Sequence, residues 1–189
     1  RAEKITLDEE IDRLKAGLEI ILPEFPKDKV ISLDTLYSDA ARVGLDLCKS
    51  HGVNVILNDV SNLRVDPKYA DMVVEYGCPI LLMASEKVPG DTKTMAEVIK
   101  VLDESVNLLV SKGYPRNKII LDPGVGKWVI DKTAEYDLAL IANFEEMRSL
   151  GLPLLMALSR KTFIGDMLGH KDPKDRYFGT VAATAISVF

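Results

Sequence analysis

Short apolar runs alternate along the chain with longer segments in which apolar residues recur at helical spacing. Each apolar run is bounded by turn-forming residues, which predicts strands buried on both faces. The expected strands cover residues 29–33, 53–57, 79–83, 118–121 and 153–158. The expected helices cover residues 6–21, 38–50, 66–76, 95–112, 133–150, 159–168 and 174–189. This regular alternation predicts an α/β fold with parallel strands and crossover helices, in one domain over residues 1–189.

Polar residues stand where the predicted strands end. Asp34, Asn58 and Asp122 follow three of the apolar runs, and the segment 159–161 follows a fourth. Site groups delivered by many strand ends are typical of a (β/α)8 TIM barrel. A doubly wound open sheet is the alternative, although its site is served by fewer strand ends. We therefore expect a barrel that is incomplete here, with about five of its eight strands.

Composition and charge narrow the class of protein. The 189 residues are 47% apolar and 28% charged, which is ordinary for a globular domain. A net charge of −5 argues against a nucleic-acid-binding surface, which is normally basic. The chain has two cysteines without CxxC spacing, and it has no apolar run long enough for a membrane span. We expect a cytoplasmic protein.

Two short motifs invite a phosphate- or anion-binding interpretation. The segment GVGK at 124–127 lacks the spacing of a P-loop, so its glycines are better explained as room for a planar ligand against the backbone. The Ser-Arg-Lys segment at 159–161 is expected to open a helix, where free amides and two cations favour an anion. No metal-ligand spacing is present, because His51 and His170 are isolated.

Six motifs in sequence order carry a family resemblance. They are SLDT (32–35), NDVSN (58–62), ILLM (80–83), ILDPGVG (120–126), ALSRKTFIG (157–165) and GTVAA (179–183). In order and spacing they resemble the pterin-binding barrel family and, within it, the dihydropteroate synthases. The resemblance implies a transferase of folate or methanopterin-type cofactor biosynthesis. Such an enzyme condenses a dihydropterin hydroxymethyl pyrophosphate with p-aminobenzoate or a related aryl amine.

The resemblance also implies roles for individual residues. Asp34, Asn58 and Asp122 would hydrogen-bond the pterin edge, and Lys161 would place a cation near the ring carbonyl. Asp34, Asp122 and Lys161 are the expected catalytic residues. Met83 would form an apolar wall and Gly126 would leave room for the ring. Ser159 and Arg160 are expected to contact the second substrate or an anion.

Other features of the family are expected outside this chain or differ from it. We expect three strands, with the loops that bind pyrophosphate and Mg²⁺, to lie beyond these 189 residues. The resemblance allows a homodimer. Lys127 and Trp128 stand where a Phe is usual, and Asn62 where Gly is commoner. These differences leave two alternatives open: a pterin-dependent methyltransferase, and a non-catalytic pterin-binding domain of a larger protein.

Overall fold

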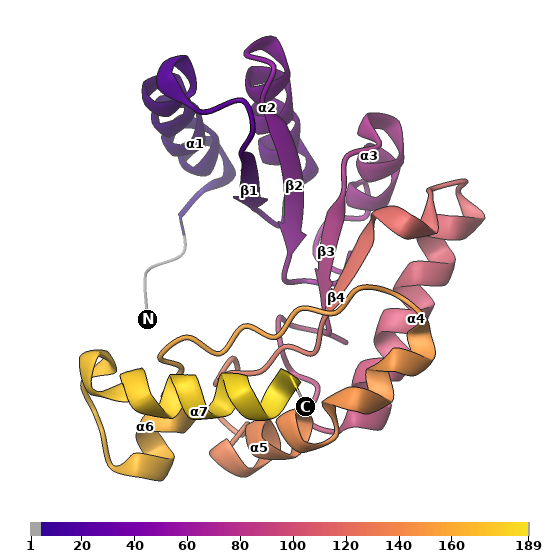
Figure 1. Cartoon of the computed structure of the whole chain (residues 1–189). Coiled ribbons are helices and arrows are strands. Elements are labelled where there is room, and N and C mark those ends of the chain that lie inside the picture. The colour runs from indigo at the N-terminus through magenta and orange to yellow at the C-terminus, as the bar shows by residue number, and fades with distance from the viewer. Residues whose placement is uncertain (1–4, 189) are drawn as a thin grey trace.

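Four parallel strands form the sheet of the protein, which we describe from a computed structural model over residues 5–188. In chain order they are β1 (Val30–Asp34), β2 (Asn54–Asp59), β3 (Ile80–Met83) and β4 (Ile119–Asp122), and each pairs with the next (Figure 1). Residues 1–4 and the last residue of the final expected helix, 189, lie outside the described residues.

The fifth predicted strand, at 153–158, is wrong as a strand. Its backbone meets β4 at an isolated parallel bridge between Leu154 and Leu121. The Leu121 N–H donates to the Pro153 carbonyl at 3.0 Å, and the Leu155 N–H donates to the Leu121 carbonyl at 2.8 Å. Within the described residues no strand pairs with the other edge of this segment, and two hydrogen bonds do not make a ladder. The segment nevertheless follows β4 in the predicted direction and place.

The helices follow the predicted order. Four of them differ from the prediction in their bounds or are divided. The α-helices are α1 (Leu7–Ile21), α2 (Ser38–Ser50), α3 (Tyr69–Tyr76), α4 (Met95–Ser111), α5 (Ala134–Ala142), α6 (Thr162–Leu168) and α7 (Tyr177–Val188). The 3-10 helices are η1 (Leu22–Glu24), η2 (Arg116–Lys118), η3 (Phe144–Leu150) and η4 (Pro173–Arg176). The helix predicted at 133–150 divides into α5 and η3, and that at 174–189 begins with η4. Helix α3 starts at Tyr69 rather than 66, and the Asp66 carboxylate before it accepts hydrogen bonds from Ser38 N and Lys68 N. Helix α6 starts at Thr162 rather than 159.

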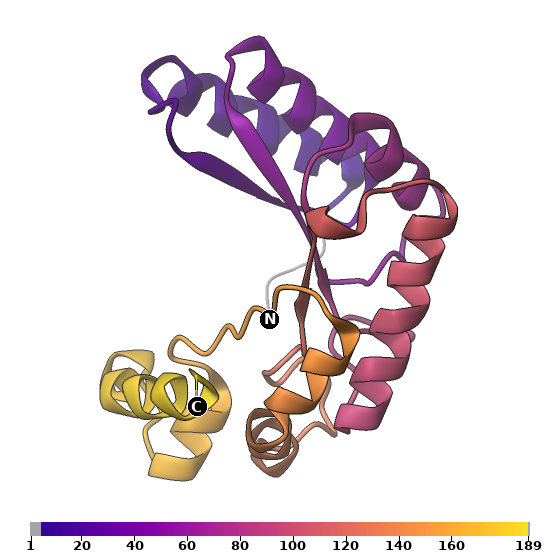
Figure 2. The ribbon, with the colours of Figure 1, turned by 45° about the vertical axis from the view of Figure 1, so that its right-hand side comes forward.

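One apolar row crosses the whole sheet. Leu33, Leu57, Ile80 and Ile119 are successive partners in the strand register, and each is at most 3% exposed. Helices α1 to α4 lie along this face of the sheet (Figure 2). A doubly wound sheet has helices on both faces, whereas a barrel has them only outside. The strand order and the one-sided helices are those of a barrel sector.

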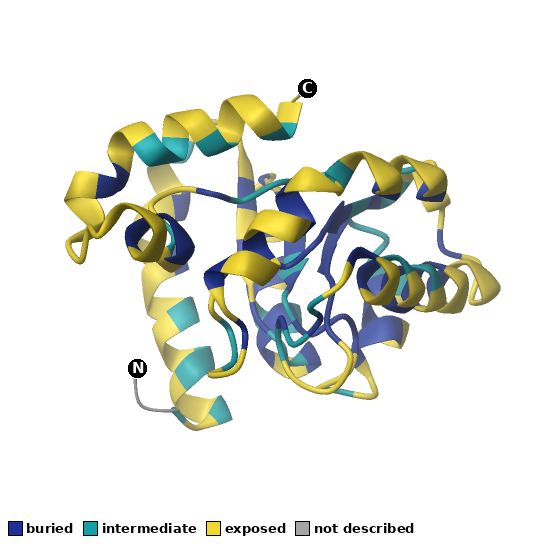
Figure 3. Cartoon of the chain, turned by 90° about the horizontal axis from the view of Figure 1, so that it is seen from below, coloured by how far each residue is buried: buried dark blue, intermediate teal, exposed yellow. Residues whose placement is uncertain are grey.

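The C-terminal helices form a separate arm beyond β4. Helix α7 has no buried residue, and its side chains Phe178 and Ile186 are 82% and 64% exposed (Figure 3). This exposed helix contrasts with the strands, whose residues are largely buried. None of the described helices has the length and hydropathy needed to cross a bilayer.

Candidate functional site

The strand register places four predicted site residues on one face of the sheet. Asp34 pairs with Asn58, and Met83 pairs with Asp122. Asn58 pairs with Leu81, which is two residues before Met83 on the same strand face. Side chains alternate along a strand, so these four residues share the face opposite the apolar row. We call this face, defined by Asp34, Asn58, Met83 and Asp122, the polar face.

Two of these residues carry acceptor groups available to a ligand. Asn58 Oδ1 is buried and has no hydrogen-bond partner among the described residues. Buried polar atoms are nearly always paired, so an unpaired amide oxygen at a strand end indicates a missing donor. The Asp34 carboxyl has a raised pKa, first because neighbouring protein atoms desolvate it and then because the Glu10 carboxylate repels its charge. A ligand with N–H donors could form hydrogen bonds with both the Asn58 amide oxygen and the Asp34 carboxylate.

Asp122 is the buried carboxylate of the polar face. It is 5% exposed, and its Oδ1 accepts the Gly124 N–H at 2.7 Å. Burial raises the pKa of Asp122, while the Gly124 amide and the charges of Lys161 and Lys132 oppose that rise. The side chain is therefore held in a fixed orientation at the end of β4.

Lys161 follows the segment at 153–158 in the chain, and its side chain lies near the end of β4. Its Nζ donates to the carbonyl of Val125 and lies 5.8 Å from the centroid of the Trp128 ring. Burial lowers the pKa of Lys161, and the carboxylates of Asp122 and Asp137 oppose that fall. The charges of Asp122 and Lys161 thus act on each other, and their shared contact with a pterin stays a prediction.

Gly126 lies where a side chain would be closely crowded by Trp128 and Lys161. A Cβ at Gly126 would lie 3.3 Å from Trp128 Nε1 and 3.4 Å from Lys161 Nζ, and the residue has φ of +131°. Glycine is the residue that accepts this backbone geometry without strain. The predicted role of Gly126 as room against the backbone is compatible with this crowding, and contact with a ligand stays a prediction.

A second charged pair, Lys132 and Asp137, contacts the backbone of residues 124–126 and was not predicted from the sequence. Lys132 is fully buried, and its Nζ donates to the carbonyls of Gly124 at 2.7 Å and Gly90 at 3.2 Å. Its Nζ lies 3.8 Å from Oδ1 of Asp137, which is 1% exposed. The same Asp137 oxygen accepts the Gly126 N–H at 2.8 Å.

One sequence signal could have found this pair. Asp137 stands at helical spacing between the buried residues Ala134, Leu140 and Ile141, so it occupies the buried face of α5. A charged residue in such a stripe requires a buried partner, because an unpaired buried charge is very costly. Lys132 has no comparable signal, because it lies in a loop.

Four charged side chains therefore hold residues 124–126, which we call the glycine loop. Asp122 and Asp137 accept the backbone N–H groups of Gly124 and Gly126. The other two side chains are lysines: Lys132 donates a hydrogen bond to the Gly124 carbonyl, and Lys161 donates one to the Val125 carbonyl.

Ser159 and Arg160 lie outside this arrangement. Both are exposed, and both precede helix α6, whose N-cap is Lys161. Arg160 has a positive φ of 52°, and its N–H donates to Thr180 Oγ1 at 2.9 Å. The expected helix N-terminus at Ser159 is therefore wrong, because the chain turns at Arg160 before the helix begins. Their contact with a second substrate stays a prediction.

The other residues of NDVSN have structural contacts. Asp59 is fully buried, and its carboxylate accepts Ser61 N, Ser61 Oγ and Leu63 N. Asn62 adopts φ of 57°, a conformation that Asn tolerates better than most residues. Its Nδ2 donates to the carbonyls of Ser85 and Val101. Asn62 thus ties β2 to the loop after β3.

The described residues contain no group of three or more His, Cys, Asp or Glu side chains placed to hold a metal ion.

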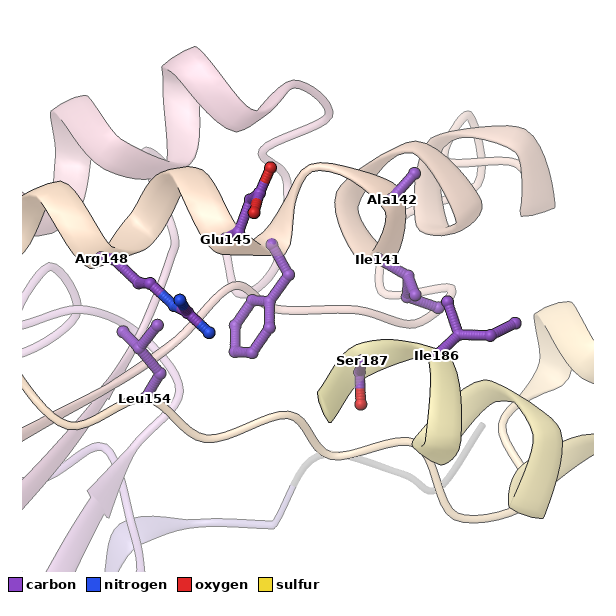
Figure 4. A pocket seen from close by; sticks show the side chains of 8 residues that line it. Ile141, Ala142, Glu145, Arg148, Leu154, Ile186 and Ser187 are labelled. Carbon is purple, nitrogen blue, oxygen red and sulfur yellow. The ribbon is translucent and has the colours of Figure 1, made fainter. Parts of the chain in front are cut away.

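A hollow of about 390 Å³ lies between η3 and the end of α7 (Figure 4). Ile141, Phe144 and Leu154 form an apolar wall, and Glu145 and Arg148 add opposite charges. None of its eight lining residues is a predicted site residue, so this hollow is separate from the polar face.

Comparison with known proteins identifies the relatives of this chain. The family model described as pterin binding enzyme matches residues 1–188. A dihydropteroate synthase from Synechocystis is 33% identical over 191 residues, which are 96% of this chain and 62% of the relative. The chain thus spans less than two thirds of the length of that relative.

Two solved structures share the fold. A dihydropteroate synthase from Clostridium difficile, solved in the presence of pteroic acid, has a TM-score of 0.84 at 31% identity. That match covers 99% of this chain and 67% of the other. The enzyme from Xanthomonas albilineans in complex with 7,8-dihydropteroate has a TM-score of 0.82 at 28% identity, over 98% of this chain and 66% of the other. The predicted incomplete barrel is confirmed.

Proposed function

The chain belongs to the pterin-binding enzyme family, and on this basis we propose that it forms the pterin half of a dihydropteroate synthase active site. The reaction condenses a dihydropterin hydroxymethyl pyrophosphate with p-aminobenzoate or a related aryl amine. The observation that carries the proposal is the polar face. There Asp34 ends β1, Asn58 is the last residue but one of β2, and Asp122 ends β4, all on one side of the parallel sheet.

Pterin recognition follows from the chemistry of these groups. The edge of a pterin ring carries several adjacent N–H donors, which require acceptors. The carboxylates of Asp34 and Asp122 supply charge-assisted acceptors, and Asn58 Oδ1 supplies a neutral one. Lys161 supplies the complementary donor for the ring carbonyl. Met83, 2% exposed and in register with Asp122, supplies an apolar surface for the ring.

The chemical step follows from the charge of the same groups. The bond between the pterin methylene carbon and the pyrophosphate oxygen breaks, and pyrophosphate leaves with the bonding electron pair. The resulting positive charge is shared by the methylene and the ring, where the fixed carboxylate of Asp122 stabilises it in a buried setting. The aryl amine then forms the carbon–nitrogen bond, and the surplus proton on its nitrogen passes to solvent. Because an aryl amine is a neutral nucleophile, no general base has to activate it.

Magnesium, where the whole protein uses it, would neutralise charge on the departing pyrophosphate. The residues of this chain bind and orient the pterin, and Asp122 stabilises the positive charge that develops on it.

Location and assembly form a further part of the proposal. The reaction requires only small-molecule partners, which suits the cytoplasm. The exposed apolar surface of α7 supports a homodimer, because side chains such as Phe178 and Val188 gain stability when covered. Light scattering of the full-length protein measures the mass of the assembly, and a monomer at all concentrations contradicts the dimer.

Calorimetric titration of the full-length protein tests the function directly. The probe is the dihydropterin pyrophosphate, added with and without p-aminobenzoate while pyrophosphate release is assayed. We expect binding alone in the first case and release of pyrophosphate in the second. Binding without release would leave a non-catalytic pterin-binding domain. Absence of binding would remove the pterin proposal altogether.

A further inference from the structure

The pair of Lys132 and Asp137 is buried beneath the glycine loop and has no role in the proposed chemistry. Both side chains are almost completely inaccessible, at 0% and 1% exposed. Removing two charges from water is costly, and a hydrophobic pair of similar volume often stabilises a fold equally well. A pair of this kind therefore calls for an explanation besides stability.

The contacts of the pair are directed at the backbone of the glycine loop. Lys132 Nζ donates to the Gly124 carbonyl at 2.7 Å, and Asp137 Oδ1 accepts the Gly126 N–H at 2.8 Å. These two groups flank Val125, whose carbonyl is held by Lys161. The orientation of each peptide in the loop is thus set by a charged side chain.

Because the loop contains two glycines, its backbone conformation has to be fixed by contacts with other residues. Gly124 and Gly126 have φ of +75° and +131°, and glycine is the residue with the widest choice of backbone conformations. A loop with two such residues has several accessible conformations when no contact selects one. The buried pair contacts both of these glycines, in the loop that Asp122 and Lys161 also contact.

The pair also joins two loops at the ends of neighbouring strands. Lys132 Nζ donates to the Gly90 carbonyl in the loop after β3, at 3.2 Å. An exposed ion pair between Lys93 and Asp131 joins the same two loops. The side chain of Asp131 is 70% exposed, so this outer pair is screened by solvent and is expected to contribute little.

We propose that Lys132 and Asp137 are positioning residues of the pterin site, which act by fixing the backbone of residues 124–126. The proposal rests on the proposed function for the identity of the ligand. The positioning itself is independent of that identity, and amide hydrogen exchange measures it without any ligand.

The test compares three variants of the full-length protein. Asp137→Asn keeps an acceptor for the Gly126 N–H and removes the charge. Asp137→Leu has a similar volume and removes the acceptor. Asp131→Leu makes the same change at the exposed pair and serves as the matched control.

Exchange of the Gly126 amide gives the first readout. We expect the amide to stay protected in the wild type, in Asp137→Asn and in Asp131→Leu. We expect exchange to be about tenfold faster or more in Asp137→Leu, the factor that corresponds to about 1.4 kcal/mol. Equal protection in Asp137→Leu would overturn the proposal. If Asp137→Leu does not fold, Asp137→Ala takes its place, and equal protection of the Gly126 amide in that variant overturns the proposal.

Pterin affinity of the folded variants gives the second readout. We expect the dissociation constant of a dihydropterin pyrophosphate to rise about tenfold in Asp137→Leu and to change less than about threefold in Asp137→Asn. A purely structural pair would lower the unfolding temperature and leave the affinity of the folded fraction unchanged, which contradicts positioning. If the wild type binds no pterin, the proposed function fails, and the exchange experiment still decides whether the pair fixes the loop.

Discussion

The indole of Trp128 lies directly against the backbone of Gly90. A Cβ at Gly90 would lie 2.2 Å from both Cδ1 and Cγ of the indole, so only glycine permits this contact. The contact joins the loop after β3 to the loop after β4. Trp128 also lies beside Lys161, so a shift of the indole would be transmitted to the predicted pterin site.

Gly90→Ala should displace Trp128 and destabilise the fold by about 1–3 kcal/mol, the cost of overpacking. Trp128 is the only tryptophan of the chain, so its emission reports the displacement directly. We expect a shift to longer wavelength in the folded variant. Gly113→Ala is the matched control, because Gly113 also has positive φ but a Cβ there would have nothing within 4 Å. An emission shift of equal size in both variants would assign the effect to backbone strain.

Asp122→Asn should weaken pterin binding by at least about 1 kcal/mol, the scale of a hydrogen bond to a charged group. Burial raises the pKa of Asp122 above its ordinary 3.8, and the ionised form is the acceptor. Wild-type affinity should therefore begin to fall at a higher pH than for an exposed aspartate as the solution is acidified. Calorimetric titration at several pH values measures both effects. Asp12→Asn, an exposed change on α1, is the control, and an unchanged affinity in Asp122→Asn removes this residue from the site.

The polar face could be predicted because its determinants are local. An apolar run followed by Asp34, Asn58 or Asp122 reveals both the strand and its end. The alternation of strands and helices makes these ends parallel neighbours. The strand register in the structure shows which of these residues are direct partners on neighbouring strands.

Other parts of the site depend on contacts between distant segments. The turn at Arg160 displaces the start of α6, and it is held by Thr180 and Arg176, which come 20 and 16 positions later. Lys132 is a loop lysine in the sequence, and only the fold buries it beneath Gly124 and beside Asp137. The segment at 153–158 has the composition of a strand, but its backbone pairs with β4 only at the Leu154–Leu121 bridge, which is too little for a ladder.

Stability should depend on pH through Lys132. Burial lowers the pKa of Lys132 from 10.5 to about 8. Between about pH 8 and 10.5, Lys132 keeps its proton in the unfolded chain but has released it in the folded protein. This difference makes the free energy of unfolding increase with pH. Other titrating groups are shared by wild type and Lys132→Met, so they largely cancel in the difference between the two.

Urea unfolding across this window measures that difference. We expect the wild type to gain stability relative to Lys132→Met as the pH rises. A constant difference would mean that Lys132 keeps an ordinary pKa in the folded protein.

Arg176 should be required for the turn that delivers Lys161. Its guanidinium is almost completely buried and donates to three backbone carbonyls, those of Arg160, His170 and Lys171. Arg176→Leu removes three hydrogen bonds from a charged donor to part-buried carbonyls. We expect a loss of about 2–3 kcal/mol in urea unfolding, since a hydrogen bond to a charged group contributes about 1.5–3 kcal/mol. Arg13→Leu, at an exposed ion pair on α1, should change stability by less than about 1 kcal/mol.

Arg176→Lys separates the geometry of the guanidinium from its charge. A lysine ammonium keeps the charge but lacks the planar fork that reaches several carbonyls at once. If the fork holds the turn at Arg160, the lysine variant should remain clearly less stable than the wild type, and its pterin affinity should fall because Lys161 is the next residue. Full recovery by lysine would instead assign the effect to charge alone. The turn at Arg160 would then need another cause, with Thr180 Oγ1 as the remaining contact to its backbone.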